Sequence, residues 1–290
     1  MAVVGTRLPA KTKKTSLILK NAKLVAGFSI FAAMLLICFF SMGFVSLDLT
    51  RIGAVPLSLR PSSEHLLGTD TSGRDIYALM VYGVPNTLLI GAVAGAVGTV
   101  FGTFLGMISG YYRGVWDNII SSAADVQLMI PILAVLIVIA AFISELNLIA
   151  LGILIALFSW AWPTRTIRSQ ILSLRERNYV ALAKASGSSD LKIIFVELLP
   201  NILPYIGASF VSAVSGGILA GIGIQVIGLG PQRTPTLGMM LYWSIYNAAV
   251  IRGLWWWWFP PVGVLIVIFI GLFMITMGVD EIANPRLRMK

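Results

Sequence analysis

The chain has 290 residues, of which 58% are hydrophobic and 11% are charged, with a formal net charge of +9. A soluble globular domain carries about 25% charged residues, so this composition excludes a soluble fold and predicts a polytopic membrane protein. Cys38 is the only cysteine, which excludes an internal disulfide or a cysteine-based metal site. His65 is the only histidine, which excludes catalysis that needs two imidazoles.

A basic arm, residues 1–23, precedes a run of uncharged residues from Leu24 to Leu47. This run exceeds the roughly 7–15 residues of a signal-peptide core, so we interpret it as a retained first span. Five more almost uncharged stretches are long enough to cross about 30 Å of hydrocarbon, and all must be helical because lipid-exposed strands would leave backbone groups unpaired. We therefore predict an all-α fold with six spans, at 24–46, 86–110, 119–142, 146–164, 204–229 and 257–279.

The outer loop before the second span is rich in turn-forming residues. It contains His65, Gly68, Asp70, Gly73, Arg74 and Asp75. A lone histidine beside two carboxylates and an arginine could form a metal or proton site. Glycines among Thr and Asp residues fit a network of tight turns better, so we expect a structural role and no metal.

Glycines recur every three or four residues along the second span. They are Gly91, Gly95, Gly98, Gly102, Gly106 and Gly110. This spacing places them on one helical face, where glycine allows a neighbouring helix to approach closely. We expect this face to pack against another helix rather than to serve as a flexible gate.

Small polar residues occupy the first half of the fifth span. They are Ser209, Ser212, Ser215 and Gly216. At helical spacing they could line a polar pathway, and they could equally form hydrogen bonds to a neighbouring helix. At the start of the sixth span, the run Trp255 to Trp258 fits an aromatic belt at the membrane surface, with a partner-binding patch as the alternative.

Six spans place both termini on one side of the membrane. That side carries 16 Lys and Arg residues and the other carries 5. The positive-inside rule therefore predicts cytoplasmic termini, and this topology accounts for the basic charge without a nucleic-acid partner. The spans contain no carboxylate pair or His/Asp relay, which disfavours a stand-alone ion-coupled carrier. Asp125, at the edge of span three, is expected to snorkel or to pair with Arg113.

The cytoplasmic segment 172–201, between spans four and five, predicts two short helices joined at a glycine. The first presents Tyr179 and Ala183 on one face and ends at Gly187, a residue that permits positive φ. Ser188 or Ser189 caps the second helix, and Asp190 favours its positively polarised first turn.

The second helix has an apolar side that must be covered. It carries Leu191, Ile194, Phe195 and Leu198, followed by Leu199 and by Pro200, which we expect to end or kink the helix. This side could lie on lipid, or it could dock into a partner protein.

The same segment resembles the EAA loop of binding-protein-dependent ABC importers, with Gly187, Leu199 and Pro200 in register. The family pattern is Glu-Ala-Ala, three residues, Gly, nine residues, Ile, any residue, Leu-Pro. The chain departs from it at Ala181, Leu182 and Glu197. The helix–Gly–helix arrangement survives these departures, whereas a salt bridge from the missing acid is not expected.

Other stretches are similar to the dipeptide/oligopeptide branch of this family. They are residues 65–75, residues 231–240, residues 284–288, and the Asp117 and Asp125 positions. The resemblance implies a type I permease fold in the cell membrane and a role for loop 172–201 as the coupling loop. It further implies a homologous second permease, two ATPase subunits and an extracytoplasmic solute-binding protein as partners.

The chain lacks a Gly-x-x-x-x-Gly-Lys-Ser/Thr phosphate loop, so we expect no ATP hydrolysis and no bound cofactor on this subunit. ATP and magnesium would bind the partner ATPases. The implied substrates are di- or oligopeptides, with oligosaccharides or another small solute as the alternative. The alternatives from other classes are a stand-alone secondary transporter or channel and a non-transporting scaffold.

Overall fold

The computed structural model describes residues 21–143 and 146–283, and this part of the chain contains helices and no β-strand. The N-terminal arm before residue 21 and the stretch 284–288 lie outside the described residues. The helices are α2 (Ala22–Met42), α3 (Ile76–Tyr112), α4 (Gly114–Met129), α5 (Ile132–Ala141), α6 (Leu148–Ser159), α7 (Ala161–Arg175), α8 (Asn178–Ala185), α9 (Asp190–Lys192), α10 (Leu199–Val226), α11 (Leu237–Tyr246) and α12 (Trp255–Ala283). A 3₁₀ turn, Leu47–Thr50, follows α2, and a π-helical turn, Ile193–Leu198, joins α9 to α10.

Four continuous helical segments are long and apolar enough to cross a membrane. They are α2, α3, the segment Asp190–Val226 that contains α10, and α12 up to Ile282. The regions predicted as spans three and four are each a bent pair: α4 and α5 meet at 80°, and α6 and α7 meet at 45°. With each pair counted as one span, the described residues contain six.

Proline explains both bends. Pro131 precedes α5, and the residue before it, Ile130, adopts the extended conformation that a following proline favours. Pro163 lies near the start of α7, and a proline ring clashes with the carbonyl four residues earlier. That carbonyl belongs to Ser159, the last residue of α6. Neither stretch is therefore the single continuous helix that a simple span would be.

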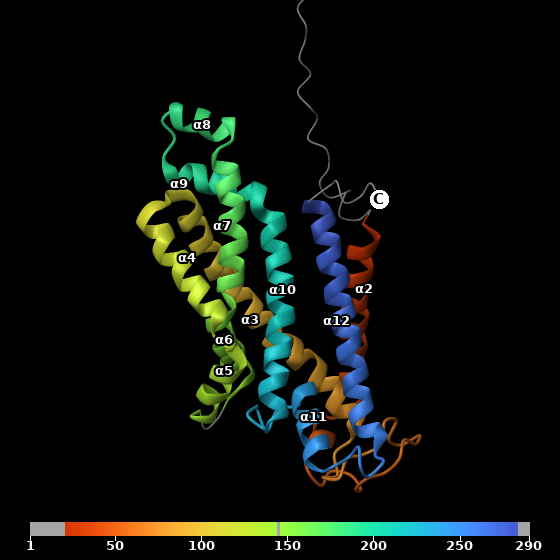
Figure 1. The fold of residues 1–290 in the computed structure, drawn as a ribbon. Coiled ribbons are helices and arrows are strands. Elements are labelled where there is room, and N and C mark those ends of the chain that lie inside the picture. Colours follow the sequence, from red (N-terminus) through yellow and green to blue (C-terminus); the bar gives the residue numbers. More distant parts are fainter. Residues whose placement is uncertain (1–20, 144–145, 284–290) are drawn as a thin grey trace, which may run out of the picture.

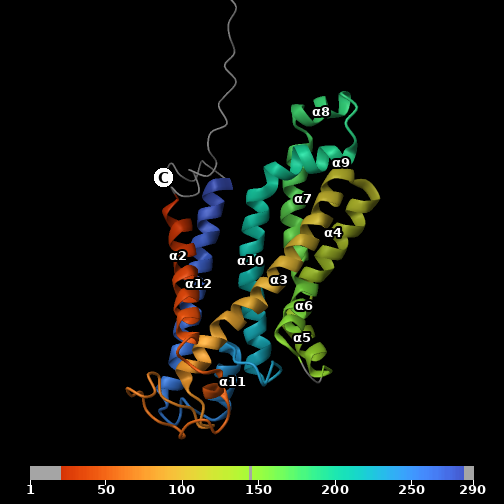
Figure 2. The same cartoon turned by 180° about the vertical axis from the view of Figure 1, so that it is seen from behind.

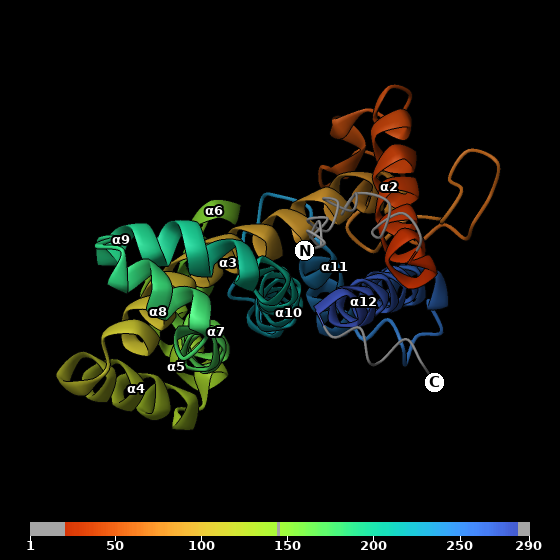
Figure 3. The same cartoon turned by 90° about the horizontal axis from the view of Figure 1, so that it is seen from above.

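The helices form two groups joined by α3 and α10. Figures 1 and 2 show α2 beside α12 on one side and α4–α9 on the other, with α10 between them. The view from above shows α3 running obliquely across the molecule from the α2–α12 group to the α4–α9 group (Figure 3). Helix α8 lies at the same end of the bundle as the start of α2 and the end of α12, whereas α11 lies at the opposite end (Figure 1).

Helix α3 is longer than the predicted second span. It begins at Ile76 rather than near residue 86, and Pro85 lies inside it. The Asp75 side chain caps its first turn by accepting a hydrogen bond from the Ala78 amide at 2.8 Å. The outer part of α3 packs against α11 and the residues just before it. The Asn86 amide donates to the Pro235 carbonyl, the Thr87 hydroxyl accepts from the Leu237 amide, and Gly83 lies against Thr236.

The glycine face of α3 lies directly against other helices. Gly91 and Gly95 contact Val214 and Ile218 of α10, and the other four glycines contact α6 and α7. A Cβ atom at Gly110 would lie 2.8 Å from Cβ of Ile171, which is closer than real Cβ contacts allow. The backbones of α3, α7 and α10 can approach this closely because no side chain separates them.

Only part of the tryptophan run lies at the surface, where the predicted belt requires it to be. Trp256 and Trp257 are buried, and only Trp255 of the first three is exposed. The Trp256 indole N–H donates to the Thr69 carbonyl at 3.3 Å, and its ring lies against Gly68. The outer loop folds over Trp256, and Trp256 and Trp257 both belong to the main hydrophobic core. Neither the belt nor the partner patch predicted this burial.

Candidate functional site

Local sequence positions the two helices of loop 172–201 through a Schellman motif. The Gly187 amide donates to the Lys184 carbonyl and the Ser188 amide to the Ala183 carbonyl, both at 3.0 Å. Gly187 adopts φ +77°, the left-handed conformation that glycine tolerates without strain. Ser189, rather than Ser188, then caps α9 by accepting from the Lys192 amide at 3.4 Å. The second helix therefore leaves the glycine in a defined direction.

The predicted apolar side of the second helix divides into a buried and an exposed part. Ile194 and Leu198 are 4% and 0% exposed and pack inside the chain, whereas Leu191 and Phe195 are 64% and 51% exposed. The π-helical turn explains the division, because its wider i→i+5 bonding shifts residues off the face that a regular helix predicts. Ile194 is thus unavailable to a partner, contrary to the expected continuous docking face.

Leu199 and Pro200 lie at the start of α10 rather than at a helix end. The helical segment runs unbroken from Asp190 to Val226. Leu199 donates its amide to the Ile194 carbonyl in the π pattern, and Pro200 follows in the first turn of α10. Pro200 therefore does not end the helical segment, whereas the alternative expectation of a kink fits the sharp turn between α9 and α10 in Figures 1 and 2.

The helix pair is fastened to the end of α3. The Tyr111 hydroxyl donates to Oδ1 of Asp190 at 2.5 Å, and Nη1 of Arg175 donates to the Tyr111 carbonyl at 2.5 Å. Nζ of Lys184, on α8, lies 5.5 Å from the centroid of the Tyr111 ring. Asp190 thus has a specific partner in addition to the helix dipole that the sequence indicated.

Tyr179 and Ala183 lie on the part of α8 that faces the second helix. Ala183 packs at the edge of the core formed with Val180 and Ile193, whereas Tyr179 is 36% exposed. Partial burial and, secondly, the nearby Glu197 carboxylate raise the pKa of the Tyr179 phenol above its ordinary value.

An ion pair that the sequence did not reveal joins three helices near this end. Asp117 of α4 accepts from Nε and Nη2 of Arg168 at 2.5 and 2.8 Å and from the Ser109 hydroxyl at 2.5 Å. The two-pronged geometry matches the fork of a guanidinium group. Asp125 lies 3.5 Å from Arg165 rather than beside Arg113, so its predicted pairing is wrong. Only tertiary structure brings the two ion pairs together, since Asp117 and Arg168 lie 51 positions apart and Asp125 and Arg165 lie 40 apart in the sequence.

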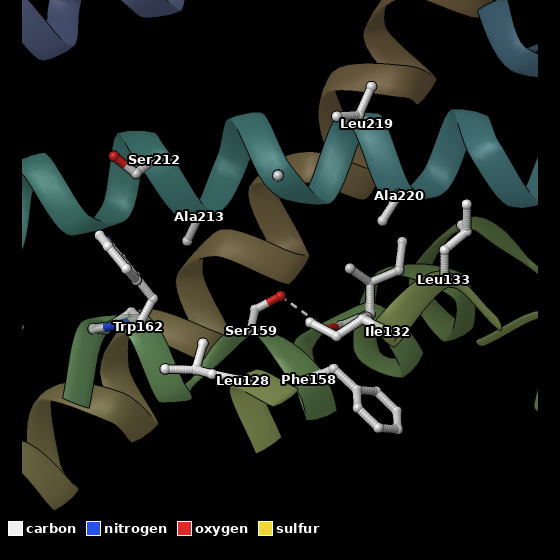
Figure 4. Close-up of a pocket in the computed structure, with 13 residues that line it drawn as sticks. Leu128, Ile132, Leu133, Phe158, Ser159, Trp162, Ser212, Ala213, Leu219 and Ala220 are labelled. Carbon is white, nitrogen blue, oxygen red and sulfur yellow. Dashed lines mark hydrogen bonds between the residues drawn. The ribbon is translucent and has the colours of Figure 1, made fainter. Parts of the chain in front are cut away.

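A cavity of about 370 Å³ opens in the middle of the bundle, next to both helix bends. Figure 4 shows α10 along one side of it and α4–α7 along the other. Its lining is mainly apolar and contains no charged side chain. The lining residues are Leu128, Ile132, Leu133, Ile155, Phe158, Ser159, Trp162, Pro163, Ser212, Ala213, Gly216, Leu219 and Ala220.

Of the four small residues predicted on span five, two line this cavity. Ser212 and Gly216 lie at its wall, and a Cβ atom at Gly216 would meet no atom within 4 Å. Ser209 is buried away from it, and the Ser215 hydroxyl donates to the Val211 carbonyl of its own helix at 2.9 Å. Ser215 therefore bonds within α10 rather than to a neighbouring helix, and a pathway role for Ser212 and Gly216 stays a prediction.

The outer loop residues form a hydrogen-bonded turn network. Asp70 accepts from Nε of Arg74 at 2.6 Å and from the Ser72 and Arg74 amides. Nδ1 of His65 lies 2.7 Å from Oδ2 of Asp75. Gly68 and Gly73 both adopt positive φ at the turns. Among the described residues, no three His, Cys, Asp or Glu side chains are grouped to hold a metal ion.

Comparison with known proteins assigns this architecture. The family described as the binding-protein-dependent transport system inner membrane component matches residues 102–289, which include the loop and the cavity. The chain belongs to this family. The resemblance noted in loop 172–201 is therefore confirmed, and the protein is a membrane-spanning permease subunit of an ABC importer.

Individual relatives of this permease extend the match to the outer loop. It is 30% identical over 272 residues to the oligopeptide transport system permease protein OppC of Lactococcus lactis, covering 92% of each chain. It is 33% identical over 271 residues to the dipeptide transport system permease protein DppC of Alkalihalophilus pseudofirmus, covering 93% of this chain and 88% of that protein. A glutathione transport system permease protein, GsiD of Escherichia coli, is 32% identical over 62% of this permease and 60% of its own length.

A solved structure confirms the type I permease fold. A chain of the MetNI methionine ABC transporter, in an inward-facing conformation, superposes with a TM-score of 0.56 at 18% identity. The match covers 71% of this permease and 95% of that chain. The all-α fold predicted for the permease is thus confirmed.

Proposed function

We propose that this permease forms half of the translocation pathway of an ATP-driven importer of di- and oligopeptides. The relatives that it matches over most of its length are named for oligopeptide and dipeptide transport. A homologous permease would supply the other half, two ATPases would bind ATP and magnesium, and an extracytoplasmic binding protein would deliver the peptide. The subunit would be multi-pass in the cell membrane, with both termini cytoplasmic.

The exposed apolar side of the coupling loop carries this proposal. Leu182, Leu191 and Phe195 project from a helix pair whose own core is already filled by Ile194, Leu198 and Val180. A fixed, preorganised apolar surface at the end of the bundle suits insertion into a cleft on an ATPase. Closure of that ATPase on ATP would then shift the permease between two conformations.

The cavity supports a pathway role for Ser212 and Gly216. Its walls provide no fixed charge, so a peptide would find few groups that hold it tightly. Transport needs binding strong enough for entry yet weak enough for release, which an uncharged wall satisfies. The two bent helix pairs at its edge would allow the walls to move by changing the bend rather than by unfolding.

Docking can be tested with a charge placed on the coupling loop. In the complete complex in vesicles, Phe195→Asp should release the ATPases or abolish ATP-driven uptake, because burying an unpaired carboxylate costs several kcal/mol. Ser169→Asp, at an exposed position of α7 outside the loop, is the matched control. Parental transport and ATPase retention in Phe195→Asp would contradict the proposal. Uptake at the parental rate by the permease in vesicles that contain no ATPase would also contradict it and would indicate a stand-alone carrier.

The substrate can be tested with the same vesicles and the cognate binding protein. ATP-dependent uptake of a radiolabelled tripeptide should be competed by unlabelled di- and tripeptides and unaffected by an oligosaccharide of similar size. Competition by the oligosaccharide alone would assign the other substrate class.

A further inference from the structure

We propose that Tyr111 is the positioning residue through which the coupling loop moves α3 and, with α3, both walls of the cavity. This inference rests on the proposed function of the loop as the ATPase contact. Tyr111 is the penultimate residue of α3 and lies outside every motif on which the family resemblance depends.

Three separate parts of the loop region hold Tyr111. Asp190, at the start of the second helix, accepts its hydroxyl hydrogen bond at 2.5 Å. Lys184, on the first helix, lies over its ring, and Arg175, at the end of α7, binds its backbone carbonyl. A residue held from three directions cannot stay in place while the helix pair moves.

The ring itself is inserted under the helix pair. Tyr111 is 6% exposed and packs in the core that contains Val180, Ile193 and Ile194. Its neighbour Tyr112 is 45% exposed, and its ring makes an edge contact with Tyr111 at 5.1 Å between centroids. The two adjacent tyrosines therefore differ in their contact with the helix pair, so Tyr112 is a matched control for Tyr111.

From Tyr111 the glycine face of α3 leads to the cavity. Gly102 lies against the Trp160 carbonyl and Pro163, beside the cavity residues Ser159 and Trp162. A Cβ atom at Gly95 would lie 2.9 Å from the Val214 amide nitrogen on α10, the opposite wall. Backbones in such close contact shift together, because packed interfaces have discrete arrangements rather than continuous ones.

The hydroxyl of Tyr111 is separable from the fold of the loop. The Schellman motif at Gly187 and the side-chain cap of Ser189 hold the helix pair together without any contribution from Tyr111. Loss of the Tyr111–Asp190 hydrogen bond should therefore leave the ATPase contact in place and loosen only the link to α3. The expected signature is ATP hydrolysis with less transport per ATP.

The test uses the complete complex in vesicles, with peptide uptake and ATP hydrolysis measured together. Tyr111→Phe should retain the ATPases and lower uptake per ATP several-fold, whereas Tyr112→Phe should not change this ratio. Asp190→Ala should match Tyr111→Phe, and Asp190→Asn, which keeps an acceptor oxygen, should restore most of the ratio. The double variant Tyr111→Phe/Asp190→Ala should be no worse than either single change.

An unchanged ratio in Tyr111→Phe would overturn the inference. So would an equal fall in Tyr112→Phe, or loss of assembly in Tyr111→Phe, since either would show a general structural effect. Absence of uptake by the parental complex would instead count against the proposed function, so the two failures are distinguishable.

Discussion

At the scale of the residue, Gly187 matters through its backbone conformation and not through side-chain contacts. Its φ is +77°, and a Cβ atom there would meet nothing within 4 Å. Any effect of substitution must therefore come from the backbone, where a left-handed conformation costs most residues about 1–2 kcal/mol. Burial, by contrast, decides the roles of Ile194 and Phe195, which are adjacent in sequence but lie inside and outside the loop core.

We expect Gly187→Val to lose transport while the protein still reaches the membrane. The β-branched side chain resists positive φ, so the helix pair should tilt or unfold and present Phe195 in no fixed direction. Gly187→Asn, which tolerates this conformation, should retain most activity. ATPase pull-down and vesicle uptake measure the difference, and equal activity of the two variants would show that the turn is not needed.

At the scale of the element, the glycine face of α3 acts through close packing. Spacing alone predicted that these residues share a face, and the structure shows which helices cover it. The coverage changes along α3, from α10 at Gly91 to α7 at Gly110, because α3 crosses the molecule obliquely. A periodic pattern cannot specify this change, since it records only the direction of a side chain and not its neighbour.

Gly102→Leu should destabilise the permease by about 1–3 kcal/mol or more, because its side chain would collide with Pro163 and the Trp160 carbonyl. Gly263→Leu in α12 is the matched control, since no atom lies within 4 Å of a Cβ atom there. The melting temperature of the purified complex and the yield of assembled subunits measure the effect. Equal stability of the two variants would mean that α3 does not need this contact.

At the scale of the whole molecule, the uneven distribution of Lys and Arg residues and the position of the coupling loop together predict the orientation in the membrane. Helix α8 lies at the end where α2 begins and α12 finishes (Figure 1). The side with 16 basic residues includes this end, so the coupling loop should face the cytoplasm. The outer loop at the opposite end should then face the binding protein.

Cysteine labelling can test this orientation in a Cys38→Ala background. An impermeant thiol reagent should label Ser63→Cys in intact cells and Glu176→Cys only in opened membranes. Both positions are exposed, Ser63 in the outer loop before α3 and Glu176 between α7 and α8. Growth-supporting transport by each variant is the control for correct folding. Labelling of Glu176→Cys but not of Ser63→Cys in intact cells would show that the orientation is the reverse of the one predicted.

The amino-acid sequence by itself determined those features that depend on local chemistry. Uncharged length predicted the spans, spacing predicted the glycine face, and a glycine followed by a serine and an aspartate predicted the helix pair of the coupling loop. Even the two bends have a local cause in Pro131 and Pro163, although local sequence does not set the bend angles. These features were predictable because each follows from a few consecutive residues.

Tertiary structure alone decided which distant residues meet. Tyr111 and Asp190 are 79 positions apart, and Trp256 and Thr69 are 187 apart, yet each pair shares a hydrogen bond. The same is true of the cavity, whose walls come from α4–α7 and α10. Hydrophobic burial is non-directional, so the sequence indicates that a face will be covered, and only the packing of the whole chain determines what covers it.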